Sequence, residues 1–274
     1  MTGLGMVCEH LSFAYQAGEQ RVLALRDISL SLAPGSSTAL LGPAGSGKST
    51  LLLILRGLLD PDEGEVRLGG VGMADRGYAE AQRSVGLVFQ QAERQLFAAT
   101  CEEDVAFGPR QLGWPPQQVQ EAVAEAMERV GLSPALFARR HPYALSGGEQ
   151  RRLALAGVLA MRPRALLLDE PFVGLDPAAR RDLSAILRGL ATSGETVVLA
   201  THEVDRAWEL CEQRVVLAGG GLAASGAWDF AAGGVELLES HGLQVPTLVE
   251  LWRRLGRPLA HPPRTATAAA EALA

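Results

Sequence analysis

The sequence predicts an α/β fold built on a largely parallel sheet, with an antiparallel β region at the N-terminus and an inserted α-helical subdomain. Short apolar strands recur at residues 38–41, 165–168 and 196–200, with a helical segment between the last two. A glycine-rich loop joins the first of these strands to a helix, and a long helical stretch precedes the second. With 274 residues, 47% of them hydrophobic, the chain can bury one large core.

The N-terminal region has the alternation that is typical of strands with one buried face. Residues 7–13 and 28–32 alternate apolar and polar side chains, and Ala33-Pro34-Gly35 forms the turn that precedes the strand at 38–41. After the glycine-rich loop, a helix is expected over residues 48–57. Two further strands are expected, at residues 64–68 and 85–89.

From about residue 91 to residue 161 the pattern becomes helical. Pro115-Pro116 opens a helix whose apolar side chains recur at helical spacing, and Gly131 closes it. We interpret this stretch as a helical subdomain inserted into a domain that spans residues 1–227. A further helix is expected over residues 177–190. The apolar residues of the helix that the two prolines open are Val119, Val123, Ala126, Met127 and Val130.

A C-terminal extension is expected over residues 228–256. Its apolar residues at i, i+3, i+4 and i+7 predict an amphipathic helix at residues 247–255. The residues of this stripe are Leu248, Leu251, Trp252 and Leu255. The last segment, residues 257–274, is rich in Pro, Ala and Thr, so we expect it to be a flexible tail.

Composition excludes several classes of function. A net charge of −6 argues against a protein that binds nucleic acid by neutralising phosphates. Cys8, Cys101 and Cys211 are scattered and odd in number, which favours incidental thiols in a reducing cytoplasm over a disulfide framework or a metal site. Neither a signal peptide nor an apolar run long enough to span a bilayer is apparent. We therefore expect a soluble chain whose membrane contact comes only through partners.

The glycine-rich loop predicts a site for ATP. Residues 42–49 satisfy the pattern G-x-x-x-x-G-K-[ST] between an apolar strand and a helix, which defines a P-loop NTPase core. Its glycines allow backbone N–H groups to point at phosphate oxygens, and the helix N-terminus adds its positive dipole end. Lys48 would reach the β and γ phosphates, and the Ser49 hydroxyl would bind Mg²⁺. The predicted nucleotide contacts are Gly42, Pro43, Ala44, Gly45, Ser46, Gly47, Lys48, Ser49 and Thr50.

Two acids end the apolar strand at residues 165–168. Asp169 and Glu170 follow it directly, at the sheet edge where open α/β sheets bind ligands. Alone, such acids are usually solvated groups at a strand end. Together with the phosphate loop, they indicate a catalytic site, in which Asp169 holds Mg²⁺ through water and Glu170 orients or deprotonates the attacking water.

Ser146-Gly147-Gly148-Glu149 has two compatible interpretations. Ser-x-x-Glu is a capping box, so it can start a helix over residues 150–161. A capped helix start with two glycines also leaves N–H groups open to an anion that approaches from outside. Because the phosphate loop already has its own helix, we interpret this second anion site as one that serves the ATP of a neighbouring subunit.

Together these three motifs resemble those of the ABC transporter ATPases, over about residues 6–227. The resemblance implies that Tyr15 stacks on adenine and that Gln90 contacts the metal site and links it to the helical subdomain. It also implies that Asp176 lies in a loop that crosses between subunits, and that His202 is a switch histidine near the γ-phosphate. Four positions depart from the usual pattern, without removing a catalytic group: Ala44, Glu149, Phe172 and Val173.

The segments 88–97, 102–109 and 157–163 are similar to the ATPases of energy-coupling-factor importers, most closely those for cobalt. The resemblance implies ATP and Mg²⁺ as cofactors and a head-to-tail dimer with an identical or paralogous ATPase, which closes on binding ATP. It also implies integral membrane transporter subunits as partners and a peripheral place on the cytoplasmic face of the membrane. The C-terminal extension would help to pair the two ATPases.

Several alternatives stay open at this point. The importer could carry a vitamin or nickel, because the ATPase touches membrane partners and not the cargo. A soluble ABC-class ATPase that acts in translation or DNA repair is disfavoured by the single cassette and by the roughly one hundred residues between the phosphate loop and Ser146. An ABC-class ATPase that acts as a switch without transport stays open, and co-purification would distinguish it. An exporter ATPase is disfavoured by the segments that resemble the coupling-factor group.

Overall fold

The structure is a computed structural model and describes residues 3–18 and 20–274. The fold is α/β, with an antiparallel N-terminal sheet and a mostly parallel sheet, as predicted. The chain divides into two compact units. The first, which we call the helical unit, holds residues 68–197 together with 33–35 and the residues up to 5. The second, the β-rich unit, holds residues 6–32, 36–67 and 198–274.

The antiparallel sheet of the β-rich unit begins with two long strands. β1 (Met6–Ala17) pairs with β2 (Gln20–Leu32), and β4 (Glu63–Leu68) lies on the other side of β1. Both long strands extend beyond the alternating segments that predict them. Register shifts in β1 let the pairing continue through its whole length, because each bulge absorbs an extra residue.

The parallel strands of this unit position the glycine-rich loop. All five residues of β3 (Ser37–Leu41) are buried, which is why its sequence is a continuous apolar run without alternation. β3 pairs in parallel with β9 (Gln213–Ala218), and β9 continues through a tight turn into antiparallel β10 (Gly221–Ala227). After the loop, α1 (Lys48–Arg56) ends at Gly57, whose left-handed conformation closes the helix where the sequence predicts it.

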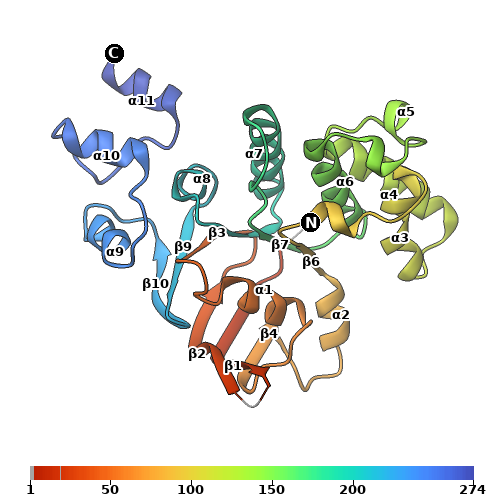
Figure 1. The fold of residues 1–274 in the computed structure, drawn as a ribbon, viewed down its shortest axis with the longest axis horizontal. Coiled ribbons are helices and arrows are strands. Elements are labelled where there is room, and N and C mark those ends of the chain that lie inside the picture. Colours follow the sequence, from red (N-terminus) through yellow and green to blue (C-terminus); the bar gives the residue numbers. More distant parts are fainter. Residues whose placement is uncertain (1–2, 19) are drawn as a thin grey trace. The chain divides into compact units, whose positions relative to one another are not determined.

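The helical unit contains the predicted helical subdomain. In it, β6 (Val85–Val88) pairs in parallel with β7 (Ala165–Asp169), and the helices α3 to α6 form one group (Figure 1). The apolar positions predicted for α4 are buried, which confirms its helical spacing. The boundary between the units falls within β8 (Thr196–Ala200). The other elements of the helical unit are β5 (Val71–Gly72), α2 (Tyr78–Arg83), η1 (Ala92–Gln95), α3 (Cys101–Gln111), α4 (Pro116–Arg129), α5 (Pro134–Phe137), η2 (Pro142–Ala144), α6 (Gly147–Leu159) and α7 (Pro177–Thr192).

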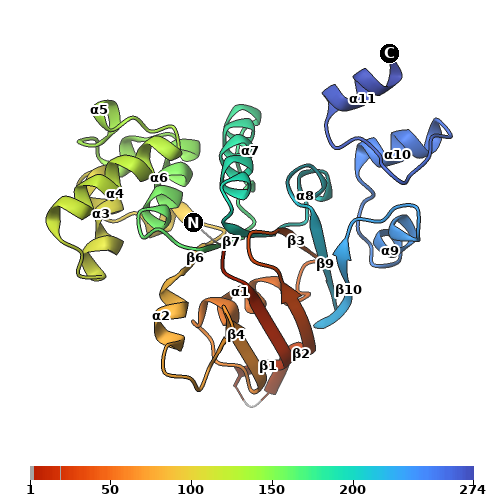
Figure 2. The same cartoon turned by 180° about the vertical axis from the view of Figure 1, so that it is seen from behind.

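The C-terminal part of the β-rich unit is helical (Figure 2). Its helices are α8 (Val204–Leu210), α9 (Gly234–Ser240), α10 (Thr247–Arg254) and α11 (Ala266–Leu273). In the part of the chain that the structure describes, no helix combines the length and the hydropathy that crossing a membrane requires.

The helix at residues 247–255 forms, but its buried face differs from the predicted stripe. Val249 and Trp252 are buried, whereas Leu251 and Leu255 are 40% and 49% exposed. The start of α10 is fixed by Thr247, whose N–H and hydroxyl both donate to the carboxylate of Asp205 on α8. This anchor sets the rotation of the helix, so that two leucines of the stripe face outward.

The segment from residue 257 carries a helix and specific contacts where the sequence predicts a flexible tail. The Trp208 indole N–H donates to the Pro263 carbonyl at 3.1 Å. The Arg264 guanidinium lies over the Trp208 ring at 4.1 Å and donates to the carbonyls of Trp208 and Cys211. Composition alone could not predict these contacts, because the partners are more than fifty residues distant in sequence.

All three cysteines are buried and free. Burial raises the pKa of the Cys8 thiol to about 12 and that of Cys101 to about 11, so both stay protonated at neutral pH.

Two of the predicted helices differ from the structure at one end only. The helix expected from residue 150 begins at Gly147, and the helix expected to end at residue 190 continues to Thr192.

Candidate functional site

The phosphate loop joins β3 to α1, and two of its glycines are required by close contacts. A side-chain carbon on Gly42 would collide with the carbonyl of Leu217 and the hydroxyl of Ser46. Gly47 has φ 98° at the start of α1, and a carbon added there would lie 2.6 Å from the Ala24 carbonyl oxygen. The loop backbone therefore lies against neighbouring strands without intervening side chains.

The groups around this loop suit a phosphate. Lys48 is buried, and its ammonium donates to the carbonyls of Gly42 at 2.8 Å and Pro43 at 3.1 Å. The first turn of α1 holds no acidic residue, so the positive end of its dipole is not neutralised there. Among the described residues, the buried hydroxyl of Ser46 has no hydrogen-bond partner. These features match the needs of a polyphosphate, which supplies acceptors and negative charge.

Two other predicted residues lie near this loop in the same unit. The Tyr15 ring on β1 is 41% exposed and packs edge-on against Phe13, with its hydroxyl 3.2 Å from the Thr50 hydroxyl on α1. His202 is exposed and directly follows Thr201, whose N–H donates to the Leu40 carbonyl of β3. The structure thus brings Tyr15 and His202 toward the two ends of the loop, one through α1 and the other through β3.

The two acids and Gln90 lie at one edge of the helical unit's strands. Val88 of β6 is in register with Leu168 of β7, so Gln90 and Glu170 follow their strands at equivalent positions. Asp169 is buried, whereas Gln90 is exposed. Glu170 has φ 46°, a left-handed conformation that is strained for a residue with a side chain. Such strain is concentrated at functional sites, where the surrounding structure enforces it.

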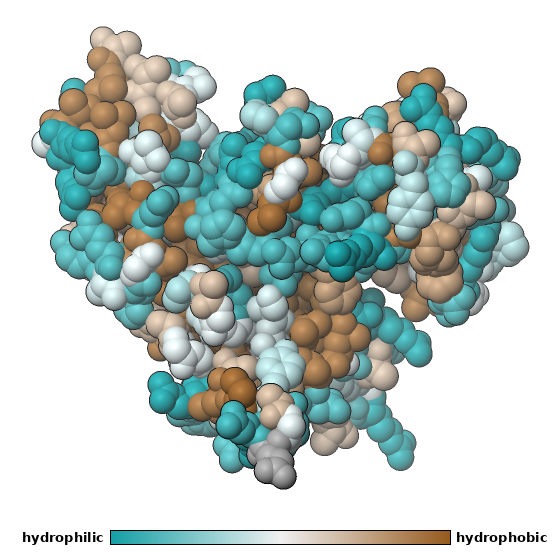
Figure 3. All heavy atoms as spheres, viewed as in Figure 1, coloured by the Kyte–Doolittle hydropathy of each residue, from teal (hydrophilic) through white to brown (hydrophobic). Residues whose placement is uncertain are grey.

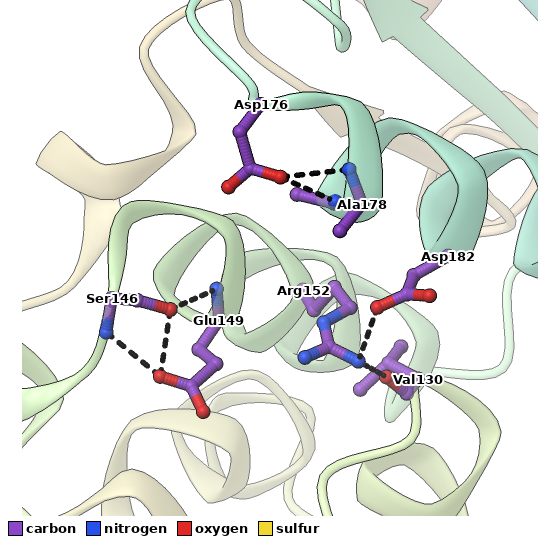
Figure 4. A network of polar contacts seen from close by, with 8 residues as sticks. Val130, Ser146, Glu149, Arg152, Asp176, Ala178 and Asp182 are labelled. Carbon is purple, nitrogen blue, oxygen red and sulfur yellow. Dashed lines mark hydrogen bonds and ion pairs between the residues drawn. The ribbon is translucent and has the colours of Figure 1, made fainter.

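The capping box at Ser146 forms as predicted (Figure 4). The Ser146 N–H and hydroxyl both donate to the Glu149 carboxylate at 2.8 Å, and the Glu149 N–H donates back to the hydroxyl. These bonds hold the pKa of the Glu149 carboxyl below its usual value. They also explain why α6 begins at Gly147, three residues before the predicted start. Glu149, which departs from the usual Gln, is therefore the acid of the box.

Asp176 caps the next helix in the same unit. Its carboxylate accepts the N–H groups of Ala178 at 2.8 Å and Ala179 at 3.0 Å, and these bonds lower its pKa (Figure 4). The first turn of α7 lies against the first turn of α6, because a carbon added to Gly148 would be 2.8 Å from the Ala179 side chain. The helix that Asp176 caps is thus packed against Gly148.

The structure therefore gathers the predicted residues into two groups, one in each unit. The β-rich unit holds the phosphate loop, Thr50, Tyr15 and His202. The helical unit holds Gln90, Asp169, Glu170, Asp176 and residues 146–148.

Sequence reasoning passed over Arg151, which is buried beside the second group. Nothing in its sequence context marks it, because an arginine on an amphipathic helix usually reaches solvent.

A strand, a phosphate-binding loop and a helix beside a mostly parallel sheet define a P-loop ATPase. The sequence pattern of the ABC transporter family matches residues 25–173, more than half of the chain. The chain belongs to the ABC transporter ATPases: it binds ATP and is an ATP hydrolase whose reaction is coupled to transport.

Relatives and solved structures agree with this assignment. The chain is 44% identical to the energy-coupling factor transporter ATP-binding protein EcfA2 of Symbiobacterium thermophilum, over 91% of this chain and 88% of the relative. It is 41% identical to the cobalt import ATP-binding protein CbiO of Rhodobacter capsulatus, over 95% and 92%. A dimeric ATP-binding cassette in a post-hydrolysis state with ADP and Pi superposes with a TM-score of 0.71 at 29% identity, covering 81% of this chain and 98% of that one.

Proposed function

We propose that this chain powers an energy-coupling-factor type importer, and that cobalt ion is the cargo of the assembly. The observation that carries this proposal is identity above 40% along nearly the whole chain to one ATPase named for the coupling factor and one named for cobalt import. Vitamin or nickel import by the same type of transporter is the alternative. We place the protein at the cytoplasmic face of the membrane, held there by its partners.

Within the ATPase we assign each predicted residue a role. Lys48 and the loop N–H groups bind the β and γ phosphates, and Tyr15 stacks on adenine. Ser49, Gln90 and Asp169 are the proposed Mg²⁺ ligands, since hydroxyl, amide and carboxylate oxygens suit this ion. Glu170 orients or deprotonates the attacking water, and His202 contacts the γ-phosphate. Catalysis then depends mainly on placement and on charge stabilisation.

The second nucleotide contact comes, in our proposal, from a facing subunit. Ser146 and Gly147 are exposed, and among the described residues none has an atom within 4 Å of a carbon added to Gly147. The N-terminus of α6 is therefore open to an anion from outside. Two chains placed head to tail would each complete the other's site, with Asp176 near the contact. The dimeric state of the related cassette supports this arrangement.

The C-terminal extension offers a second contact between chains. Leu251 on α10 and Leu255, which directly follows this helix, are half exposed and lie one turn apart. We propose that they pack against the equivalent helix of a partner ATPase. We retain the domain limits of 1–227 for the ATPase and 228–256 for the extension. Residues 257–274, which include α11, form a separate C-terminal segment that contacts α8 through Pro263 and Arg264.

The helical unit carries a surface suited to a membrane subunit. A hollow of about 310 Å³ lies between η1, α3 and α6, lined mainly by apolar side chains. Phe97 and Phe107 line it and pack edge to face, 62% and 46% exposed, and Figure 3 shows hydrophobic patches among hydrophilic ones over the helical subdomain. Two exposed phenylalanines in a concave site suit an amphipathic helix of a partner. We assign this hollow to a coupling helix of the membrane component.

Co-purification tests the importer assignment. The wild-type chain is expressed together with the products of its neighbouring genes and is captured from the membrane fraction by a tag. Integral membrane subunits should be recovered with it. Phe107→Glu should lose them while ATP binding is retained, because the substitution lies outside both groups of nucleotide residues. Recovery of ribosomes or DNA in place of membrane subunits would contradict the importer assignment.

Glu170→Gln tests the proposed chemistry. This variant should bind ATP normally, hydrolyse it far more slowly and form a dimer that persists in the presence of ATP. Light scattering with and without ATP measures the dimer, and phosphate release measures turnover. Hydrolysis at the normal rate would show that the base is another group.

A further inference from the structure

Arg151 makes an unusual set of contacts for an arginine on a helix. It lies on α6, and only 6% of its surface is exposed. One terminal nitrogen, Nη1, donates to the carbonyls of Pro171 at 2.9 Å and Val173 at 2.7 Å. The other, Nη2, donates to the Gln90 carbonyl at 2.9 Å and the Glu93 carboxylate at 3.1 Å.

These four acceptors belong to two loops that carry candidate catalytic groups. Pro171 and Val173 follow Glu170 after β7, and Gln90 and Glu93 follow β6. Because β6 and β7 are parallel neighbours, both loops leave the same edge of the sheet. The planar guanidinium presents its N–H groups in a rigid fork, so one side chain can bind both loops at once. A lysine ammonium, as a single donor centre, cannot span the same acceptors.

The loop after β7 needs support, because Glu170 is in the left-handed region. A strained backbone of this kind persists only where its surroundings hold it. The Val173 N–H donates to the Glu170 carbonyl at 3.3 Å, and Phe172 between them is fully buried. Arg151 binds the carbonyls on both sides of Phe172. It therefore holds the turn whose geometry fixes the direction of the Glu170 side chain.

Among the four acceptors of Arg151, only the Glu93 carboxylate carries a charge that balances the guanidinium. Burial raises the pKa of the Glu93 carboxyl, but the bonds from its own backbone N–H and from Arg151 outweigh that effect and lower it. Glu93 is therefore ionised at neutral pH. The remaining acceptors are carbonyl dipoles, which suit a guanidinium whose charge is spread over a plane.

We propose that Arg151 is a positioning residue for ATP hydrolysis, which ties the loops of Gln90 and Glu170 to the helix that begins at Gly147. A shift of α6 would then move both loops together with the Gly147-Gly148 pair. This proposal rests on the roles assigned to Gln90 and Glu170 above.

Arg151→Lys in the full-length chain tests the proposal, because it keeps the charge and removes the fork. We expect kcat to fall by roughly ten- to a hundredfold, the range in which small misplacements of catalytic groups lie. KM for ATP and the equilibrium binding of a fluorescent ATP analogue should stay within about twofold of the wild type, since Arg151 is not among the residues assigned to the nucleotide. Arg151→Met removes the charge as well and should lower kcat at least as far.

Arg152→Lys is the matched control. Arg152 is the next residue on the same helix and also binds a main-chain carbonyl, that of Val130, but it reaches neither loop. Its kcat should stay within about twofold of the wild type. Unfolding by urea, followed for all variants, shows whether each is folded under the conditions of the rate assay.

Two results would overturn the proposal. One is an unchanged kcat for folded Arg151→Lys. The other is a loss of kcat accompanied by an equal loss of ATP binding and of stability, which would indicate a general structural role. Glu170→Gln, assayed in parallel, separates this failure from that of the underlying assignment, because normal turnover in that variant would refute the catalytic role of Glu170 itself.

Discussion

Gly148→Ala probes the contact between the helix of the capping box and the helix that follows Asp176. The added methyl carbon would lie 2.8 Å from the Ala179 side-chain carbon, whereas unstrained carbons stay about 3.5–4 Å apart. The two helix ends must therefore separate by roughly 1 Å. Overpacking of this kind costs about 1–3 kcal/mol in the free energy of unfolding. The gain in helix propensity offsets at most about 1 kcal/mol of that cost.

Urea unfolding measures this effect, and Gly147→Ala is its control. A carbon added to Gly147 has no neighbour within 4 Å among the described residues, so the stability of that variant should equal or slightly exceed that of the wild type. Its ATPase activity should nevertheless fall, because the methyl group faces the surface where a second subunit would approach. Gly148→Ala should lose both stability and activity.

The double variant Gly148→Ala with Ala179→Gly shows whether the clash is the cause. Removing the Ala179 side chain takes away the colliding carbon, although glycine in the first turn of α7 itself costs up to about 1 kcal/mol. The double variant should be more stable than the sum of the single changes predicts, by about 1 kcal/mol or more. Strict additivity, or a Gly148→Ala protein as stable as the wild type, would refute the packing argument.

Two further predictions concern the C-terminal helices. Trp252→Ala should lower the free energy of unfolding by roughly 3 kcal/mol, because Trp252 is buried. Leu251→Ala, at a 40% exposed position, should change it by less than about 0.5 kcal/mol in a monomeric sample. Urea unfolding compares the two variants, and equal effects would contradict the observed rotation of α10. Arg264→Ala should release the segment that precedes α11 from Trp208 and Cys211, so amide hydrogen exchange at residues 266–273 should accelerate while the rest of the chain is unaffected. Unchanged exchange would mean that other contacts hold α11.

The parts of the fold that sequence reasoning predicted are those set by local chemistry. The phosphate loop, the buried strand β3 and the capping box at Ser146 depend on residues close to one another in the chain, and the structure has all three. The contacts of the segment before α11 depend on Trp208, a distant residue, so composition could not predict them. The rotation of α10 depends in the same way on Asp205.

The same distinction between local and long-range features applies to the candidate site. Its residue types and spacings could be predicted because phosphate binding and acidic strand ends have local patterns. The burial of Arg151 and the left-handed backbone of Glu170 could not, since both depend on loops that come together only in the folded chain. The roles of the site residues stay predictions that the proposed variants test.

Complementation between two inactive variants tests the central proposal, that each ATP site is shared by two chains. Lys48→Ala damages the phosphate loop, and Ser146→Arg blocks the N-terminus of α6 in the other half of the site. Each variant alone should hydrolyse ATP at a small fraction of the normal rate. If two chains build each site, mixing the variants should restore activity well above either one, because a mixed dimer contains one site with both halves intact. Activity that stays at the average of the two, in a sample where cross-linking confirms mixed dimers, would contradict the shared site.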